Sequence, residues 1–315
     1  MGKKLIYILL FFSVTVTAQQ EQLYTQFMFN KQLFNPAYVG NEDVASGTIL
    51  LRDQWNGFTG APKTQLLSFA TPLNDNKIGV GINLINHKIG LNKRLTIEGM
   101  YAYRINTDYG NFSLGLQGSI RKYDLDFRDA SIVTTQSIDL DPTINPVRLT
   151  KNIFNFGLGL YYNTNLYYIG ASIPRLAQAN LDFDANGEIT EESRHIYLMG
   201  GGAFVINPTI TFRPQLLFKY AVNAPYDLDI NAGLTFKEKY TTAITYRTGG
   251  NRGGIGESID LIFSIQTSPQ LMFGFAYDIT MSDIRSYQNG SIEVMAHYMF
   301  VKRANQEEII NPRYF

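Results

Sequence analysis

The sequence predicts an all-β fold, a transmembrane antiparallel β-barrel of about 14 strands with a short N-terminal periplasmic or plug segment. Three observations predict it. Apolar residues alternate with polar or small residues along most of the chain, as at 95–104 and 226–236. Connections between these runs are tight at every second position and mostly longer at the others. Charged residues gather on one of the two alternating faces, which leaves the other face suited to lipid.

Composition limits the class of protein. The chain has 315 residues, of which 45% are hydrophobic, 13% aromatic and 17% charged, whereas soluble domains average about 25% charged residues. The 27 basic residues balance 27 acidic ones, so the sequence lacks the basic excess that nucleic-acid binding requires. The chain contains no cysteine. That excludes disulfide frameworks, thiolate zinc sites, cysteine nucleophiles and the lipid-modified cysteine of bacterial lipoproteins.

Residues 1–18 have the organisation of a secretory signal peptide. Lys3 and Lys4 precede the apolar run 5–12, and small residues follow up to Ala18, after which we expect cleavage. The apolar run is much shorter than the about 20 residues of a membrane-spanning helix. The sequence therefore predicts an exported protein.

Residues 19–44 are rich in aromatic residues but lack the alternation of a strand. We expect a short helix or tucked segment at the periplasmic mouth of the barrel, where it buries these side chains. A disordered tail is the alternative, and the aromatic density disfavours it. The candidate residues of this plug motif are Tyr24, Phe27, Phe29, Asn35 and Pro36.

Residues 45–302 are assigned to the barrel, and 303–315 to a C-terminal periplasmic tail. With an even strand number, the first strand begins and the last strand ends at the end of the barrel that has the short turns. In outer-membrane barrels this end faces the periplasm, and the long loops are extracellular. The expected strands lie near residues 45–55, 63–72, 77–86, 93–106, 109–121, 152–163, 165–174, 193–206, 209–222, 226–238, 240–247, 256–267, 270–281 and 290–302.

One alternating face carries nearly all the charge of the clear strands. An Arg or Lys on the lipid face near the membrane midplane costs about 2–4 kcal/mol, so we expect this face to line a water-filled lumen. A secreted β-sandwich or propeller also alternates, but its outer face is the charged one. The charged residues of this face are Glu98, Arg104, Arg121, Arg213, Lys219, Asp227, Asp229, Arg247, Asp260, Asp278, Glu293 and His297.

Candidate chemistry is sparse. His87, His195 and His297 lack metal-ligand spacing. His297 with a hydroxyl and an acid would make an esterase, but the sequence has no Gly-x-Ser-x-Gly motif, so we predict no enzyme and no organic cofactor.

Residues 182–187 resemble the first half of a Ca²⁺ loop, with Asp182, Asp184 and Asn186 as candidate ligands. The position of the usual bidentate Glu is Ser193, which favours a surface turn over a Ca²⁺ site.

Two N-terminal motifs resemble a known family. They are QLYTQFMFN at 22–30 with NPAY at 35–38, and RDQWNGFTGAPKT at 52–64; residues 101–104 and the final NPRYF at 311–315 also fit. These motifs resemble the PorP/SprF family. The resemblance implies an outer-membrane component of the type IX secretion system of Bacteroidota, with a secreted cargo protein and other secretion components as partners. The SprF branch of the family is associated with large gliding adhesins, and the resemblance brings no catalytic residues.

Taken together, these features predict a barrel that docks or anchors secreted cargo, with a lumen closed by residues 19–41 and by charges of both signs. A diffusion channel or substrate-specific transporter is the alternative, and conductance separates the two. The first long loop is the candidate partner site; bracing of neighbouring loops is its other possible role. Its candidate residues are Arg52, Gln54, Trp55, Gly57, Phe58, Gly60 and Pro62.

Overall fold

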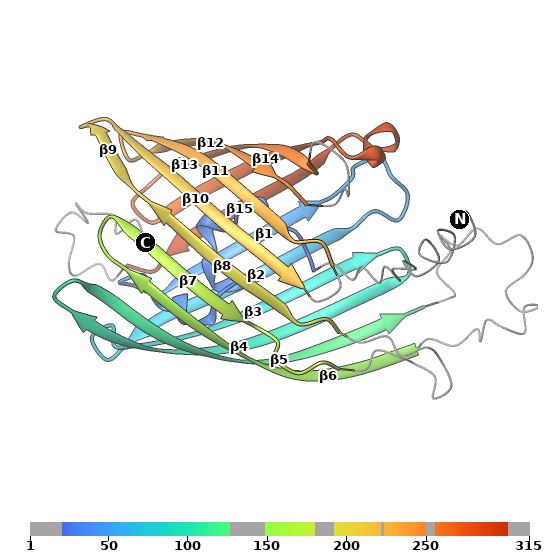
Figure 1. Cartoon of the computed structure of the whole chain (residues 1–315), viewed down its shortest axis with the longest axis horizontal. Helices are drawn as coiled ribbons and strands as arrows, with labels where there is room; N and C mark the ends of the chain where they lie inside the picture. Colours follow the sequence, from blue (N-terminus) through green and yellow to red (C-terminus); the bar gives the residue numbers. More distant parts are fainter. Residues whose placement is uncertain (1–20, 127–148, 180–191, 222–223, 250–255, 302–315) are drawn as a thin grey trace, which may run out of the picture.

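The computed structural model describes residues 21–126, 149–179, 192–221, 224–249 and 256–301. Across these residues the chain forms a closed antiparallel barrel of 14 strands with one additional short strand, as Figure 1 shows. The predicted fold class is confirmed. Among the described residues no helix is long and apolar enough to cross a bilayer.

The strands are β1 (Ser46–Asp53), β2 (Lys63–Leu73), β3 (Ile78–Ile89), β4 (Asn92–Thr107), β5 (Gly110–Leu125), β6 (Leu149–Asn163), β7 (Tyr167–Ile173), β8 (His195–Gly202), β9 (Phe204–Asn207), β10 (Ile210–Ala221), β11 (Asp227–Phe236), β12 (Tyr240–Arg247), β13 (Ser258–Gln266), β14 (Leu271–Thr280) and β15 (Ser291–Met299). The short 3₁₀ helices are η1 (Phe27–Phe29), η2 (Lys31–Leu33), η3 (Pro36–Tyr38) and η5 (Asp283–Tyr287).

Neighbouring strands pair in chain order, except that β8 pairs with β10 and not with β9, and the pairing of β1 with β15 closes the barrel. The single strand expected at 193–206 is divided at Ala203 into β8 and β9, which both pair with β10. The register against β10 continues across this division, but within β9 it shifts by one residue, because Val205 pairs with Thr211 and Asn207 with Ile210. Such a bulge bends the strand locally.

The two ends of the barrel differ. At the short-turn end, β2 and β3 join through Asn74, Asp75 and Asn76, whose φ angles of 51°, 51° and 63° are ones that Asn and Asp tolerate best among non-glycine residues. β1 begins and β15 ends at this end. At the opposite, long-loop end lie the connections 54–62 and 281–290, and β7 ends and β8 begins there, although β3 and β4 join there in a short turn.

The wall has an apolar outer face and a polar inner face. Outward residues such as Leu116 and Phe263 are 56% and 44% exposed, and a continuous apolar surface of this kind fits a bilayer rather than water. Most of the charged residues predicted to line a water-filled lumen are buried in the interior instead. Glu98, Arg121 and Glu293, for example, are at most 2% exposed.

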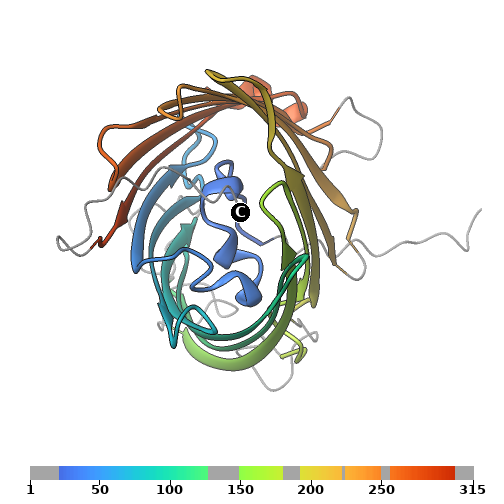
Figure 2. The same ribbon diagram turned by 90° about the vertical axis from the view of Figure 1, so that its left-hand side faces the viewer.

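The lumen is occupied by the N-terminal part of the chain. Residues 21–44, named here the plug segment, lie inside the ring of strands, as the end-on view in Figure 2 shows in blue. Glu21 contacts residues next to the long-loop end, and Val39 contacts Gly79 near the short-turn end, where β1 then begins. The segment thus runs through the barrel instead of resting at one mouth, because the lumen wall supplies the partners that its aromatic and polar groups need.

Candidate functional site

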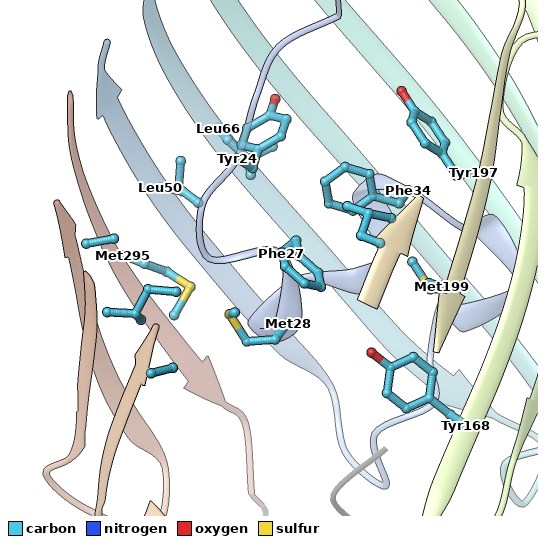
Figure 3. Packing of buried hydrophobic residues seen from close by; sticks show 14 of the residues in the cluster. Tyr24, Phe27, Met28, Phe34, Leu50, Leu66, Tyr168, Tyr197, Met199 and Met295 are labelled. Carbon is cyan, nitrogen blue, oxygen red and sulfur yellow. The ribbon is translucent and has the colours of Figure 1, made fainter. Parts of the chain in front are cut away.

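Aromatic side chains of the plug segment form the core of the molecule (Figure 3). Phe27 is 1% and Phe34 3% exposed. Phe34 meets Tyr24, Phe27 and Tyr197 edge to face, with ring centroids 6.0, 6.5 and 5.5 Å apart. Full burial of one such side chain contributes about 1.5–3 kcal/mol, so this cluster holds the plug segment firmly against the wall. Wall residues that complete the cluster include Leu50, Leu66, Tyr168, Met199 and Met295.

A buried charged group binds the start of the plug segment near the long-loop end. The Arg52 guanidinium lies 2.6 Å from an Asp278 oxygen and 3.3 Å from a Glu293 oxygen. It also donates to the Thr25 hydroxyl at 2.8 Å. The backbone N–H groups of Thr25 and Gln26 donate to the Glu293 carboxylate at 2.9 and 2.8 Å. The carboxylate therefore has both a cation and two plug amides as partners.

Arg247 extends this group along the wall. Its guanidinium donates to Asp229 at 2.8 Å and lies 3.4 Å from Asp260. Lys219 bonds Asp229 at 2.8 Å from the other side. Charges of both signs, placed on neighbouring strands, thus neutralise one another inside the barrel. Such neutralisation is required for charges withdrawn from water.

A second buried group surrounds Glu21, the first described residue. Its carboxylate lies 2.7 Å from Arg121, 3.1 Å from Arg175 and 3.5 Å from Arg94. Burial by itself opposes ionisation, but the three guanidinium groups hold the pKa of Glu21 well below its ordinary value. A carboxylate with a lowered pKa keeps its stabilising contribution until the pH falls below that pKa. This attachment therefore persists under mildly acidic conditions.

Glycines of the wall leave room for the plug backbone. A Cβ atom on Gly115 would lie 2.2 Å from the Ala37 nitrogen, and one on Gly79 would lie 1.9 Å from the Val39 oxygen. Beside the first of these sites, Asn35 accepts from the Ala37 N–H at 2.9 Å and donates to the Leu160 carbonyl at 2.8 Å. The wall is thus shaped to the plug segment and not only closed around it.

The predicted plug residues all lie in this interior. Tyr24, Phe27, Asn35 and Pro36 are buried and Phe29 is half-buried. The alternation of apolar and polar residues does not by itself predict which wall residues contact the plug segment. The glycines on the polar parity, Gly115 among them, were a usable signal, since a small residue on an inner face marks a close approach.

The first long loop is braced on both sides. The Asn56 N–H donates to the Gly290 carbonyl at 2.7 Å, and the Asn289 N–H donates back to Asn56 at 2.7 Å. On the other side, the Gly90 N–H donates to the Gly60 carbonyl at 2.9 Å. The loop therefore joins the β14–β15 connection to the β3–β4 turn.

The candidate partner residues of this loop differ in how far they are exposed to solvent. Arg52 and Pro62 are buried, and Arg52 donates a hydrogen bond to the plug segment instead of lying on the surface. Gln54 and Trp55 are half-buried, while Gly57 and Gly60 are exposed, and Phe58 is 43% exposed. Only part of the predicted set is thus accessible to a partner.

The remaining candidate chemistry is limited. The Ca²⁺ candidates Asp182, Asp184 and Asn186 lie outside the described residues, and within these residues no group of three or more His, Asp or Glu is placed to hold a metal ion. His297 lies 2.8 Å from the Thr48 hydroxyl and 3.4 Å from Glu42. Thr48 is only 4% exposed, and this chain of side chains links the end of the plug segment to β15.

Comparison with known proteins gives a family and a fold. A sequence profile described as "Type IX secretion system membrane protein PorP/SprF" matches residues 16–298. No curated protein matches the chain.

Solved structures with the same fold are outer-membrane barrels. The Acinetobacter baumannii outer membrane protein Omp33 has a TM-score of 0.50 at 8% identity and covers 83% of this chain and 100% of its own. A Pseudomonas aeruginosa FadL homologue has a TM-score of 0.50 at 12% identity, with coverage of 87% and 94%. A mutant of the monoaromatic hydrocarbon channel TodX has a TM-score of 0.50 at 11% identity, with coverage of 88% and 94%.

The Arg52→Ala variant tests the charged group that holds the plug segment. Removal of the cation leaves Asp278 and Glu293 buried beside each other, and breaking a buried pair in this way costs about 3–5 kcal/mol. Denaturant unfolding of the refolded barrel measures the loss. The control is Lys63→Ala, whose partner Asp53 is exposed; a surface pair of this kind contributes about 0–1 kcal/mol. Equal effects of the two substitutions contradict the assignment.

The Gly115→Val variant tests the fit between wall and plug segment. The added side chain overlaps the backbone at Ala37. Overpacking of this kind lowers the free energy of unfolding by about 1–3 kcal/mol, and the melting temperature falls by about 3–10 °C. Gly99→Val is the matched control, because a Cβ at Gly99 meets nothing within 4 Å. Heat-dependent gel migration measures both midpoints, and an unchanged midpoint for Gly115→Val refutes the fit.

Proposed function

The chain belongs to the PorP/SprF family of type IX secretion system membrane proteins, and on that premise we propose that it is a non-enzymatic outer-membrane barrel that docks secreted cargo. In this proposal it anchors a protein of the gliding-adhesin kind and links it to the secretion machinery. Residues 1–18 direct export and are removed. The short-turn end, the start of β1 and the end of β15 face the periplasm, and the long loops face outward.

The observation that carries the proposal is the filled lumen. The plug segment is bound through Arg52, Glu293 and Glu21 at the long-loop end and packed against wall glycines further down. A barrel of 14 strands is also narrower than the 16–18-stranded porins that leave an aqueous channel. A filled interior of this kind supports a barrel that binds partners at its two ends over a barrel that conducts through its lumen.

A channel or substrate-specific transporter is the second candidate. Its support is the fold likeness to the TodX channel and the FadL homologue. In that case the plug segment is a gate that moves aside for a substrate. The two candidates differ in one measurable property, the conductance of the resting barrel.

The accessible part of the first long loop is the proposed contact surface. Phe58 is 43% exposed, and Tyr287 of the adjoining η5 is 72% exposed. The hydrogen bonds to Gly290 and Gly90 hold the loop in place. Exposed aromatic residues on a rigid support are typical of binding hot spots.

Conductance of the purified barrel in planar bilayers separates docking from transport. A docking barrel gives no steady conductance between about pH 8 and pH 5, because Glu21 stays ionised and paired over this range. Steady ohmic currents from the wild-type protein contradict the proposal and favour a channel.

The Phe58→Ala variant tests the contact surface. We expect recovery of the secreted partner with the tagged protein to fall about tenfold, as loss of an aromatic hot spot predicts. Tyr109→Ala is the control, because Tyr109 is 86% exposed but lies at the short-turn end. Full recovery with Phe58→Ala assigns the loop to bracing instead.

A further inference from the structure

The outward face of four neighbouring strands changes from apolar to basic toward the long-loop end. In β2, β4 and β5 the outward residues Leu67, Ile97 and Ile120 are 46%, 40% and 44% exposed and belong to the lipid-facing surface. Nearer the long loops, the same face of each of these strands, and of β3 between them, carries a lysine. The four strands lie side by side in the barrel (Figure 1). The four residues, named here the lysine belt, are Lys63, Lys88, Lys93 and Lys122.

The strand register places the members of the lysine belt beside one another. Lys63 pairs with Lys88, and Lys88 pairs with Lys93. Residues paired in this way point to the same face, with Cβ atoms about 4.5–5.5 Å apart. Lys122 pairs with Leu95, so it is a diagonal neighbour of Lys93 at about 7–8 Å. Like charges placed directly opposite each other are destabilising, and an anion beside them relieves the repulsion.

The acidic neighbours of the lysine belt are fewer than its lysines. Asp53 lies 3.1 Å from Lys63, in a pair whose side chains are 46% and 66% exposed. Asp124 pairs with Lys93 in the strand register and is 8% exposed. Lys93 and Lys122 themselves are exposed. Along this rim of the described strands, four basic residues therefore face two acidic ones, and the surface carries net positive charge.

The opposite half of the barrel carries aromatic residues at the corresponding place. Near the long-loop ends of β10, β12 and β14 the outward residues are Tyr220, Tyr246 and Tyr277, and the described outward positions of β10–β14 hold no lysine or arginine. Tyrosine suits the border between hydrocarbon and headgroups anywhere around a barrel. Four lysines gathered on one arc therefore indicate a particular anionic ligand, beyond general anchoring at the interface.

The position of the lysine belt along the barrel selects the chemistry of this ligand. The apolar residues next to it lie against hydrocarbon, so its ammonium groups lie at the level of the lipid headgroups, which lysine reaches by extending its apolar stem. Ammonium groups form charge-assisted hydrogen bonds with phosphate oxygens. The matching ligand therefore has phosphate at the level of the lysines and acyl chains against the apolar residues. A phosphorylated lipid combines the two.

We propose that the lysine belt binds the phosphate groups of an outer-leaflet glycolipid, whose acyl chains lie against β2–β5. The inference rests on the proposed outward orientation of the long loops, which makes the outer leaflet the source of the lipid, and not on the docking of cargo. Because β2 begins directly after the first long loop, the bound lipid lies next to the proposed contact surface.

The double variant Lys93→Gln/Lys122→Gln tests the lysine belt. It removes two exposed charges and leaves the backbone pairing of β4 and β5 as it is. The matched control is Lys237→Gln/Lys239→Gln, which removes two exposed lysines from the turn between β11 and β12 at the short-turn end. The readout is native mass spectrometry of the purified full-length barrel titrated with phosphorylated lipid A, with heat-dependent gel migration as the check of folding.

We expect Lys93→Gln/Lys122→Gln to bind phosphorylated lipid A about thirtyfold more weakly than the wild type, which corresponds to about 1 kcal/mol for each lysine. The control should bind as the wild type does. Equal affinities of the wild type and Lys93→Gln/Lys122→Gln, or an equal loss in the control, overturn the proposal.

Two further lipids identify the recognised group. Dephosphorylated lipid A should bind the wild type much more weakly than the phosphorylated form, and equal binding of the two forms overturns the assignment of phosphate as the recognised group. Phosphatidylglycerol carries a phosphate on a different lipid. If it binds as tightly as phosphorylated lipid A, the assignment to a glycolipid is wrong.

Labelling of intact cells tests the orientation separately. The chain has no cysteine, so Phe58→Cys supplies a single thiol on the exposed part of the first long loop. We expect a membrane-impermeant maleimide to label this thiol on intact cells. Labelling only after the cells are broken contradicts the proposed orientation and the outer-leaflet source, whereas the lipid titration of the purified barrel tests the lysine belt itself.

Discussion

The rest of the structure depends on the pairing of the charges inside the barrel, which the wall and the plug segment complete together. A lumen lined with carboxylates and guanidinium groups is stable away from water only if each charge has partners. The backbone N–H groups of Thr25 and Gln26 complete the shell of Glu293, and Glu21 brings an anion to three arginines. Barrel and plug segment are therefore one folding unit, in which neither part satisfies its buried groups alone.

Much of the fold was predictable because a strand between lipid and a polar interior has to alternate. Leu116 and Phe263 face outward, and Glu98 and Arg121 face inward, as the alternation predicts. The route of the plug segment was not predictable in this way. Alternation tells which face is polar but not what fills the space beside it, and the bond from Thr25 to Glu293 joins residues 268 positions apart.

The candidate site was predicted in part. The motif at 52–64 holds residues with two different roles. Arg52 points into the lumen and binds the plug segment, whereas Phe58 is exposed on the loop. The sequence marked both as one site because they are close in the chain. The proposed docking function draws on both the filled lumen and the braced loop.

The central claim, that the plug segment is a built-in part of the barrel interior, is tested most directly by hydrogen–deuterium exchange of the native protein. The account predicts that the amides of residues 23–39 exchange as slowly as those of the paired strands, because most of these residues are buried, the N–H groups of Thr25 and Gln26 are bonded to the wall, and others are bonded within the segment. Exchange of these amides as fast as that of the exposed turn at 74–76 would contradict it, since the segment would then leave the lumen readily and the barrel would stand open.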